Sequence, residues 1–264
     1  MILAFDIGNT NIKVALCEKN LIIHQWRISK DSKRTGDEYF SILRPLFRDV
    51  GIEFKQIDDV VLSTVVPALM GPFVNVSQNI TGKKPFIVEP SIYNKLPVKV
   101  PATAVHEIGT DLLCDAVAAW EVFKGPCIVA DFGTALSFTA VDKNANIAGI
   151  AIAPGIRTAF NSLFANTAQI PAISLDIPRS SLGKNTVESV QSGIVLGYKG
   201  LVESMIQNMK EDMQKESQTE ISSVKVMATG GLNSMLAPIT EIFDCIDKEL
   251  TIKGLLRIKE YCSI

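Results

Sequence analysis

The chain has 264 residues, of which 47% are apolar and 20% charged, and its formal net charge is −2. This length allows one large domain or two of roughly 100–150 residues, and the composition is typical of a globular protein with a well-filled core. The charge balance lacks the basic footprint of a nucleic-acid-binding protein, and no apolar run approaches the ~20 residues of a membrane span. We therefore expect neither nucleic acid nor membrane as a partner.

Cysteine and histidine usage bounds the compartment and the chemistry. The five cysteines are scattered without a CxxC pair, and only two histidines are present. A thiolate or imidazole metal site is therefore disfavoured. The N-terminus enters an apolar strand directly, without the basic and apolar regions of a signal peptide. These features predict a cytoplasmic, reduced protein.

The first half begins with three strands and continues with alternating helices and strands. Strands are expected over 2–6, 12–17, 21–28, 60–63 and 86–88, and helices over 37–47, 67–79 and 109–123. The helix over 109–123 has a broad apolar face and leads into the second half. We place the boundary within it, which gives N-terminal and C-terminal halves of residues 1–115 and 116–264. Alternating strands and helices favour an α/β fold.

The second half restarts the same strand pattern. Strands are expected over 127–131, 136–142, 147–153 and 221–228, and helices over 185–216 and 252–261. Asn185 or Thr186 can cap the long helix, with Glu188 completing a capping box. Its predicted apolar side comprises Val190, Ile194, Tyr198, Leu201, Met205 and Met209. The shared beginning of the two halves predicts an internal duplication.

A strand followed by an acidic residue and a glycine turn opens both halves. The first copy supplies Asp6, Gly8 and Lys13, and its full turn is Asp6, Ile7, Gly8, Asn9, Thr10, Asn11, Ile12 and Lys13. Its amides and short polar side chains suit phosphate oxygens, and a carboxylate at a strand end suits hydrated Mg²⁺. An ordinary β-turn with an exposed lysine is the alternative. No GxxxxGK[ST] sequence occurs, which excludes a P-loop.

The other candidate positions lie at strand ends and helix starts. Asp131, with Gly133 and Thr134, forms the second copy and could hold a cation or a terminal phosphate. Asp111 could accept a proton from an attacking alcohol, or could only be a favourable negative charge at the N-terminus of its helix. Asp115, four residues later, faces the same side of the helix as Asp111. Thr186 could bind an anion or only cap its helix. The Gly-Gly turn at 229–232 is a weak candidate for contact with a base.

Taken together, these motifs resemble the actin/Hsp70/sugar-kinase superfamily, and more closely the type III pantothenate kinases. The matching strings are DIGNTNIK (6–13), GTD (109–111), AVAAW (116–120), DFGTA (131–135), AGIAIAPGI (148–156), GKNTVESVQSGIVLGY (183–198), ATGGL (228–232) and DKELTIKGLLRI (247–258). Their order and spacing span nearly the whole chain.

The resemblance implies duplicated RNase-H-like (actin-like ATPase) domains with mixed β-sheets and ATP in the interdomain cleft, in a homodimer. It implies phosphorylation of the pantothenate hydroxyl by ATP, the first step towards coenzyme A. By resemblance, Asp111 is the proton acceptor, the 6–13 turn and Thr134 contact ATP with Mg²⁺ at Asp6, and Asp131 binds a monovalent cation, K⁺ or NH₄⁺. The substrate contacts implied are Gly109, Thr110, Asp111, Leu112 and Thr186.

Two positions depart from the family pattern. Leu112 stands where the family motif GxDR has arginine, and Ala102 stands where the family tends to have a substrate-contacting tyrosine. Losing the arginine's charge-assisted hydrogen bond would cost ~1.5–3 kcal/mol. Two alternatives to an active pantothenate kinase therefore stay open. They are an ATP-binding regulator or impaired pseudo-kinase, and a kinase for another small hydroxylated acceptor.

Overall fold

The computed structural model describes residues 1–165, 173–231 and 233–263. These residues form two compact units, one comprising 1–118 with 250–264 and the other 119–249. The predicted division into 1–115 and 116–264 differs from this at the C-terminus, because the last helix packs with the first unit. Sequence order alone does not reveal such a return of the chain.

The first unit is built on a mixed five-stranded sheet. Its strands are β1 (Ile2–Ile7), β2 (Asn11–Glu18), β3 (Leu21–Ser29), β4 (Asp59–Thr64) and β5 (Phe86–Ile87). The strand order is β3-β2-β1-β4-β5. The pairs β1–β2 and β2–β3 are antiparallel, and the pairs β1–β4 and β4–β5 are parallel. The predicted strands are confirmed, and the hairpin of β1 and β2 carries the 6–13 turn.

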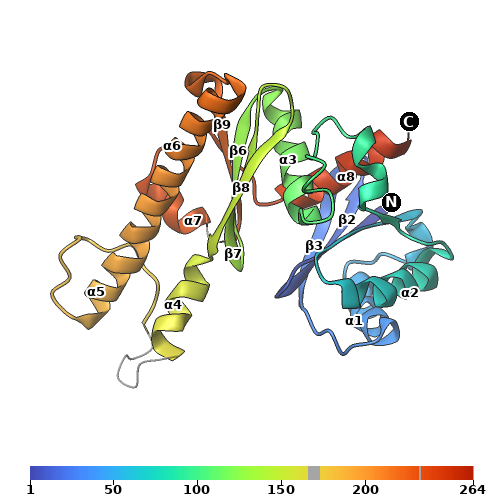
Figure 1. Ribbon diagram of the computed structural model, residues 1–264. Helices are drawn as coiled ribbons and strands as arrows, with labels where there is room; N and C mark the ends of the chain where they lie inside the picture. The colour runs from blue at the N-terminus through green and yellow to red at the C-terminus, as the bar shows by residue number, and fades with distance from the viewer. Residues whose placement is uncertain (166–172, 232, 264) are drawn as a thin grey trace. The chain divides into compact units, whose positions relative to one another are not determined.

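Helices cover both faces of this sheet (Figure 1). The long helices are α1 (Gly36–Asp49), α2 (Met70–Thr81), α3 (Thr110–Phe123) and α8 (Leu250–Ser263), with 3₁₀ turns at Phe54–Gln56, Pro67–Leu69 and Pro90–Lys95. Alternate residues of β1, β2 and β4 pack with α1 and α2 in one apolar core. Helix α8 packs on the other face, against β1 and β4.

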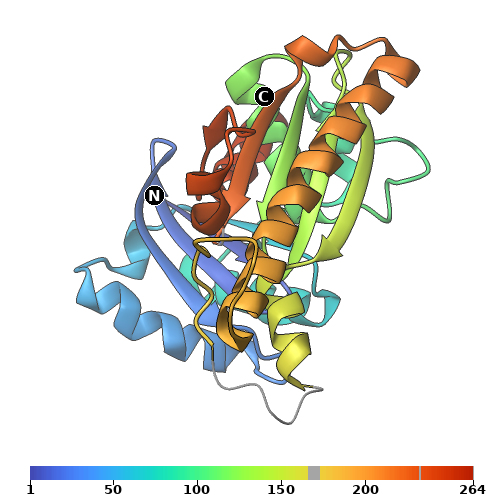
Figure 2. The same ribbon diagram turned by 90° about the vertical axis from the view of Figure 1, so that its left-hand side faces the viewer.

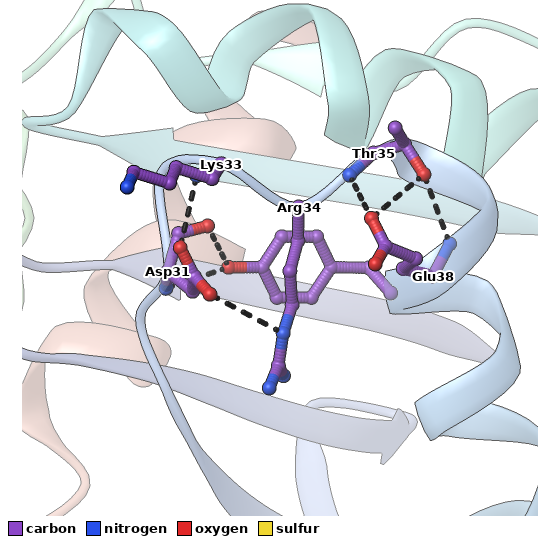
Figure 3. A network of polar contacts seen from close by, with 6 residues as sticks. Asp31, Lys33, Arg34, Thr35 and Glu38 are labelled. Atoms are coloured by element: carbon purple, nitrogen blue, oxygen red, sulfur yellow. Dashed lines mark hydrogen bonds and ion pairs between the residues drawn. The ribbon is translucent and has the colours of Figure 1, made fainter.

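The start of α1 shows how local sequence sets a helix boundary. Thr35 accepts a hydrogen bond from the Glu38 amide, while the Glu38 carboxylate accepts one from the Thr35 amide, a complete capping box (Figure 3). The segment before the helix is also held, because the Tyr39 hydroxyl in α1 donates a hydrogen bond of 2.8 Å to the Asp31 carbonyl. The helix predicted over 37–47 is confirmed.

The second unit repeats the first sheet. Its strands are β6 (Cys127–Phe132), β7 (Ala135–Val141), β8 (Ile147–Pro154), β9 (Lys225–Gly230) and β10 (Cys245–Ile246). The order β10-β9-β6-β7-β8 is the counterpart of the first sheet, with β6 antiparallel to β7 and parallel to β9. The expected duplication of the strand pattern is thus confirmed. The predicted strand over 221–228 begins only at Lys225, because Ile221–Ser223 forms a 3₁₀ turn.

The long helix of the second unit contains a wide turn. It comprises α5 (Thr186–Gln191), a π-helical turn (Ser192–Leu196) and α6 (Gly197–Ser217), while α4 is Ile156–Ala165 and α7 is Asn233–Leu236. Figures 1 and 2 show α6 along one face of the sheet. The residues that pack most deeply there are Val195, Tyr198, Val202, Ile206 and Met213. Of the predicted apolar side, Tyr198 is buried, and Ile194, Leu201, Met205 and Met209 are partly buried and pack against the same core.

No helix among the described residues is both long and apolar enough to cross a membrane.

Candidate functional site

Strand alternation gathers polar groups on one face of the first sheet. Asp6 on β1 pairs in register with Lys13 on β2 and with Ser63 on β4. The residues flanking each of them in sequence, such as Phe5 and Ile7, point into the α1–α2 core. Asp6, Lys13 and Ser63 therefore lie together on the face that α8 covers.

Lys13 links the hairpin to α8. Its Nζ lies 3.2 Å from Oδ2 of Asp6 and donates a hydrogen bond of 3.3 Å to the hydroxyl of Thr251. Asp6 is only 6% exposed, so its charge needs compensation within the protein. The lysine supplies that compensation and remains partly accessible itself.

The hairpin turn presents backbone rather than large side chains. The Gly8 amide donates to the Asn11 carbonyl at 3.0 Å, and a Cβ at Gly8 would lie 3.3 Å from that oxygen. Asn9 and Thr10 are exposed at the tip. The side chains of Ile7 and Ile12 are buried in the core. These two predicted ATP-contacting residues can therefore contact a ligand only through their backbone.

Asp111 lies in the first turn of α3, as predicted. Its Oδ1 accepts a hydrogen bond of 2.8 Å from the Leu112 amide. A Cβ at Gly109 would lie 2.4 Å from the same oxygen, so any other residue there would displace the carboxylate from this position. Burial, followed by the negative charge of Asp6, raises the pKa of Asp111. A raised pKa makes a carboxylate a better proton acceptor.

Two hydroxyls fix the start of α3. Ser63 and Thr110 share a hydrogen bond of 2.9 Å, which connects the end of β4 to the first residue of the helix. Thr110 is predicted to contact substrate, but its hydroxyl already serves this structural contact. Ser63 was not anticipated from the sequence. The one feature of the sequence that could have indicated Ser63 is its place near the end of the predicted strand over 60–63, which pairs in parallel with β1.

Carboxylates concentrate beneath the start of α3. The pKa of the Cys114 thiol is raised well above its usual value by burial and then by the charges of Asp6, Asp115 and Asp111. Asp6, on β1, thus lies near enough to the start of α3 for its charge to act there together with those of Asp111 and Asp115. Mg²⁺ is usually held by one or two carboxylates together with phosphate oxygens, which fits the predicted role of Asp6. Among the described residues, no group of three or more His, Cys, Asp and Glu could hold a metal ion by itself.

The second hairpin places Asp131 at the counterpart of Asp6. Its register partners are Ser137 on β7 and Thr229 on β9. The Thr229 hydroxyl is buried and has no hydrogen-bond partner among the described residues. Gly230 has a φ of +86°, and a Cβ there would lie 2.5 Å from Oδ1 of Asp131. The side chains at these three register positions all carry oxygen atoms, and oxygen ligands suit hard cations.

The tip of the second hairpin is held by the start of α4. The Thr134 carbonyl accepts hydrogen bonds from the Gly155 amide at 3.0 Å and from the Thr158 hydroxyl at 2.7 Å. A Cβ at Gly155 would lie 2.4 Å from the Gly133 carbonyl oxygen, so glycine permits this approach. The Thr134 side chain is exposed.

Thr186 is the first residue of α5, and its side chain is exposed. The cap is Asn185, whose side chain accepts from the Glu188 amide at 2.9 Å. The Glu188 carboxylate accepts from the Lys184 amide, one residue before the cap. Capping therefore does not occupy the Thr186 hydroxyl. Of the Gly-Gly segment, Leu232 lies outside the described residues.

Comparison with known proteins identifies a family and a fold. The family model described as type III pantothenate kinase matches residues 2–208. A candidate Baf family transcriptional activator from Campylobacter jejuni has a similar structure, with a TM-score of 0.58, 16% identity and coverage of 99% of this chain and 100% of that one. The activator of 2-hydroxyisocaproyl-CoA dehydratase from Clostridium difficile, with bound ADPNP, has a TM-score of 0.54 and 13% identity, and the match covers 99% of this chain and 96% of that one. MreB 5 of Spiroplasma citri, bound to AMPPNP, has a TM-score of 0.53 and 10% identity, with coverage of 99% of this chain and 96% of that one. These similarities confirm the actin-like ATPase fold.

Proposed function

The chain belongs to the type III pantothenate kinase family, and from this premise we propose that it transfers the γ-phosphoryl group of ATP to the hydroxyl of pantothenate. The family match supports an ATP-dependent kinase. The choice of pantothenate as acceptor, and thus a place at the first step towards coenzyme A, is the finer part of the proposal.

The single observation that carries the proposal is the environment of Asp111. A partly buried carboxylate with a raised pKa lies at the start of α3, and the negative charge of Asp6 contributes to the raised pKa. In phosphoryl transfer a carboxylate of this kind accepts the proton of the attacking hydroxyl. Asp111 would orient the acceptor hydroxyl and take its proton as the bond to phosphorus forms.

The β1–β2 hairpin is the proposed phosphate-binding element. Its exposed tip at Asn9 and Thr10 offers polar groups, and Lys13 offers a positive charge. Two proteins of the same fold were solved with ATP analogues, ADPNP and AMPPNP. Asp6 would hold Mg²⁺, which when bound neutralises charge on the transferred phosphoryl group.

The second hairpin is proposed to serve a monovalent cation. Asp131 would supply a carboxylate oxygen and Thr229 its buried hydroxyl, while Thr134 would contact ATP. Carboxylate and hydroxyl oxygens are appropriate ligands for K⁺. The homodimer and the cytoplasmic location remain predictions, as does contact of Thr186 with substrate.

Leu112 motivates a second candidate function. Next to Asp111, where the family has arginine, leucine offers no donor to a carboxylate or phosphate. A protein that binds ATP but has lost the acceptor reaction, or that phosphorylates a different small alcohol, would also show this substitution. The pantothenate kinase is the better-supported candidate, because Asp111 and its positioning contacts are retained.

A coupled assay for ADP release separates these candidates. The protein is supplied with MgATP and KCl, with and without pantothenate and then with other small hydroxylated acids. We expect ADP release that depends on pantothenate. If ADP is released only with a different acceptor, that acceptor replaces pantothenate as the proposed substrate. If ATP binds but no ADP is released with any acceptor, the ATP-binding regulator is favoured.

A further inference from the structure

Thr251 lies in the first turn of α8, 238 residues after the lysine that it contacts. It is 2% exposed, and its hydroxyl accepts the hydrogen bond from Nζ of Lys13 at 3.3 Å. The same Nζ lies 3.2 Å from Asp6. The ammonium group is therefore bounded by a strand residue on one side and a helix residue on the other.

A lysine at a phosphate-binding turn gains from such contacts. Its ammonium is a point charge on a flexible four-carbon side chain, and holding that chain in one conformation costs entropy. The ammonium of Lys13 keeps both its ion pair with Asp6 and its hydrogen bond to Thr251 only if it stays between them. Fixing the charge in advance reduces the entropy lost when phosphate binds.

Helix α8 is itself held firmly in the first unit. Gly254 is in such close contact with α3 that a Cβ there would lie 1.9 Å from the Cys114 carbonyl oxygen. Lys259, further along α8, forms an ion pair with Asp59 at the start of β4. The helix thus contacts α3, which carries Asp111, and also β4 and Lys13.

We propose that Thr251 is a positioning residue for ATP binding, and that its hydroxyl holds Lys13 where the lysine meets the nucleotide phosphates. The proposal deepens the proposed function, and it rests on the ATP-binding part of that function rather than on the choice of acceptor. The C-terminal helix thereby completes a phosphate-binding turn formed at the N-terminus.

The test compares ligands with and without phosphates. Calorimetry measures the Kd of MgATP and of adenosine for the wild type and for Thr251→Val, which replaces the hydroxyl by a methyl group. We expect the Kd of MgATP to rise about three- to tenfold while that of adenosine is unchanged. Thr251→Ser, which keeps the hydroxyl, should restore the wild-type value. In a Lys13→Met background, Thr251→Val should have no further effect.

A matched control measures the cost of losing any buried hydroxyl. Thr219 is fully buried, and its hydroxyl contacts Ser217 and the Lys143 amide in the second unit. Thr219→Val should leave the Kd of MgATP unchanged, whatever its effect on the melting temperature.

Several results would overturn the proposal. It fails if Thr251→Val leaves the Kd of MgATP unaltered, or raises the Kd of adenosine as much as that of MgATP. It also fails if Thr251→Ser does not restore the wild-type Kd of MgATP, or if the effects of Thr251→Val and Lys13→Met on that Kd add. A wild type that binds MgATP but does not phosphorylate pantothenate would overturn the proposed function and leave the role of Thr251 standing. A wild type that binds no MgATP would overturn both.

Discussion

The two hairpins share a backbone plan and differ in what surrounds the carboxylate. In the first, Asp6 has Lys13 and Ser63 as register partners. In the second, Asp131 has Ser137 and Thr229 at the same two positions. The first hairpin therefore places a lysine beside its acid, and the second places a serine at the corresponding position.

This difference matches the two roles proposed above, phosphate binding at the first hairpin and monovalent cation binding at the second. A carboxylate already compensated by lysine adds little net charge, so the turn beside it can accept phosphate. The register partners of Asp131 carry neutral hydroxyls, and we propose that its carboxylate binds a cation. The two hairpins differ here at one position of the second strand, which carries Lys13 in β2 and Ser137 in β7.

The largest expected effect follows from Asp111, which lies beside the first hairpin. Asp111→Asn should lower kcat at least ~10²-fold, because the amide cannot accept a proton. Steady-state kinetics with pantothenate measure this. Turnover near that of the wild type would remove Asp111 from the role of proton acceptor.

The same variant should be more stable than the wild type at neutral pH. The pKa of Asp111 is raised in the folded state by burial and by Asp6. Its contribution to stability is therefore present below the unfolded-state pKa and is lost as the pH rises through the folded-state pKa. The neutral amide avoids this loss. The melting temperature of Asp111→Asn should exceed that of the wild type at pH 7, and the gap should narrow as the pH falls.

Ser137→Lys tests most directly whether the residue opposite the carboxylate decides what each hairpin binds. This change places an ammonium group opposite Asp131, as Lys13 lies opposite Asp6. The ammonium should take the place of the monovalent cation, so rates with and without KCl should become equal. Ser137→Ala, the control, should keep the response to KCl. A full response to KCl in Ser137→Lys would show that the cation is not bound at Asp131.

A smaller gain is expected at Leu112. Leu112→Arg restores the family residue and its forked donor, and kcat/KM for pantothenate should rise about tenfold. Leu112→Met keeps an uncharged side chain of similar size and should change little. If arginine lowers kcat/KM, the acceptor pocket has adapted to leucine, and a different acceptor should be sought.

Local sequence patterns were sufficient for much of the fold. The β1–β2 and β6–β7 hairpins, α1 and α3 follow from apolar spacing, caps and turns, each of which acts over a few residues. The π turn between α5 and α6 did not follow, because such a turn leaves no clear signal in apolar spacing.

The site was predictable in part for the same reason. Asp6, Lys13 and Asp111 stand in recognisable strings, and the structure brings them together in one unit. Thr251 also lies in a recognised string, but its role depends on a return of the chain over more than two hundred residues. Ser63 depends on the pairing of β1 with β4. Such long-range contacts are set by packing rather than by local sequence.

The central claim is transfer of phosphate to pantothenate, and label transfer tests it directly. The wild type and Asp111→Asn are incubated with ATP labelled at the γ-phosphate, Mg²⁺, KCl and pantothenate, and the products are separated. We predict labelled phosphopantothenate with the wild type and at least ~10²-fold less with Asp111→Asn. Label that remains in ATP, or appears only as inorganic phosphate, would contradict the account.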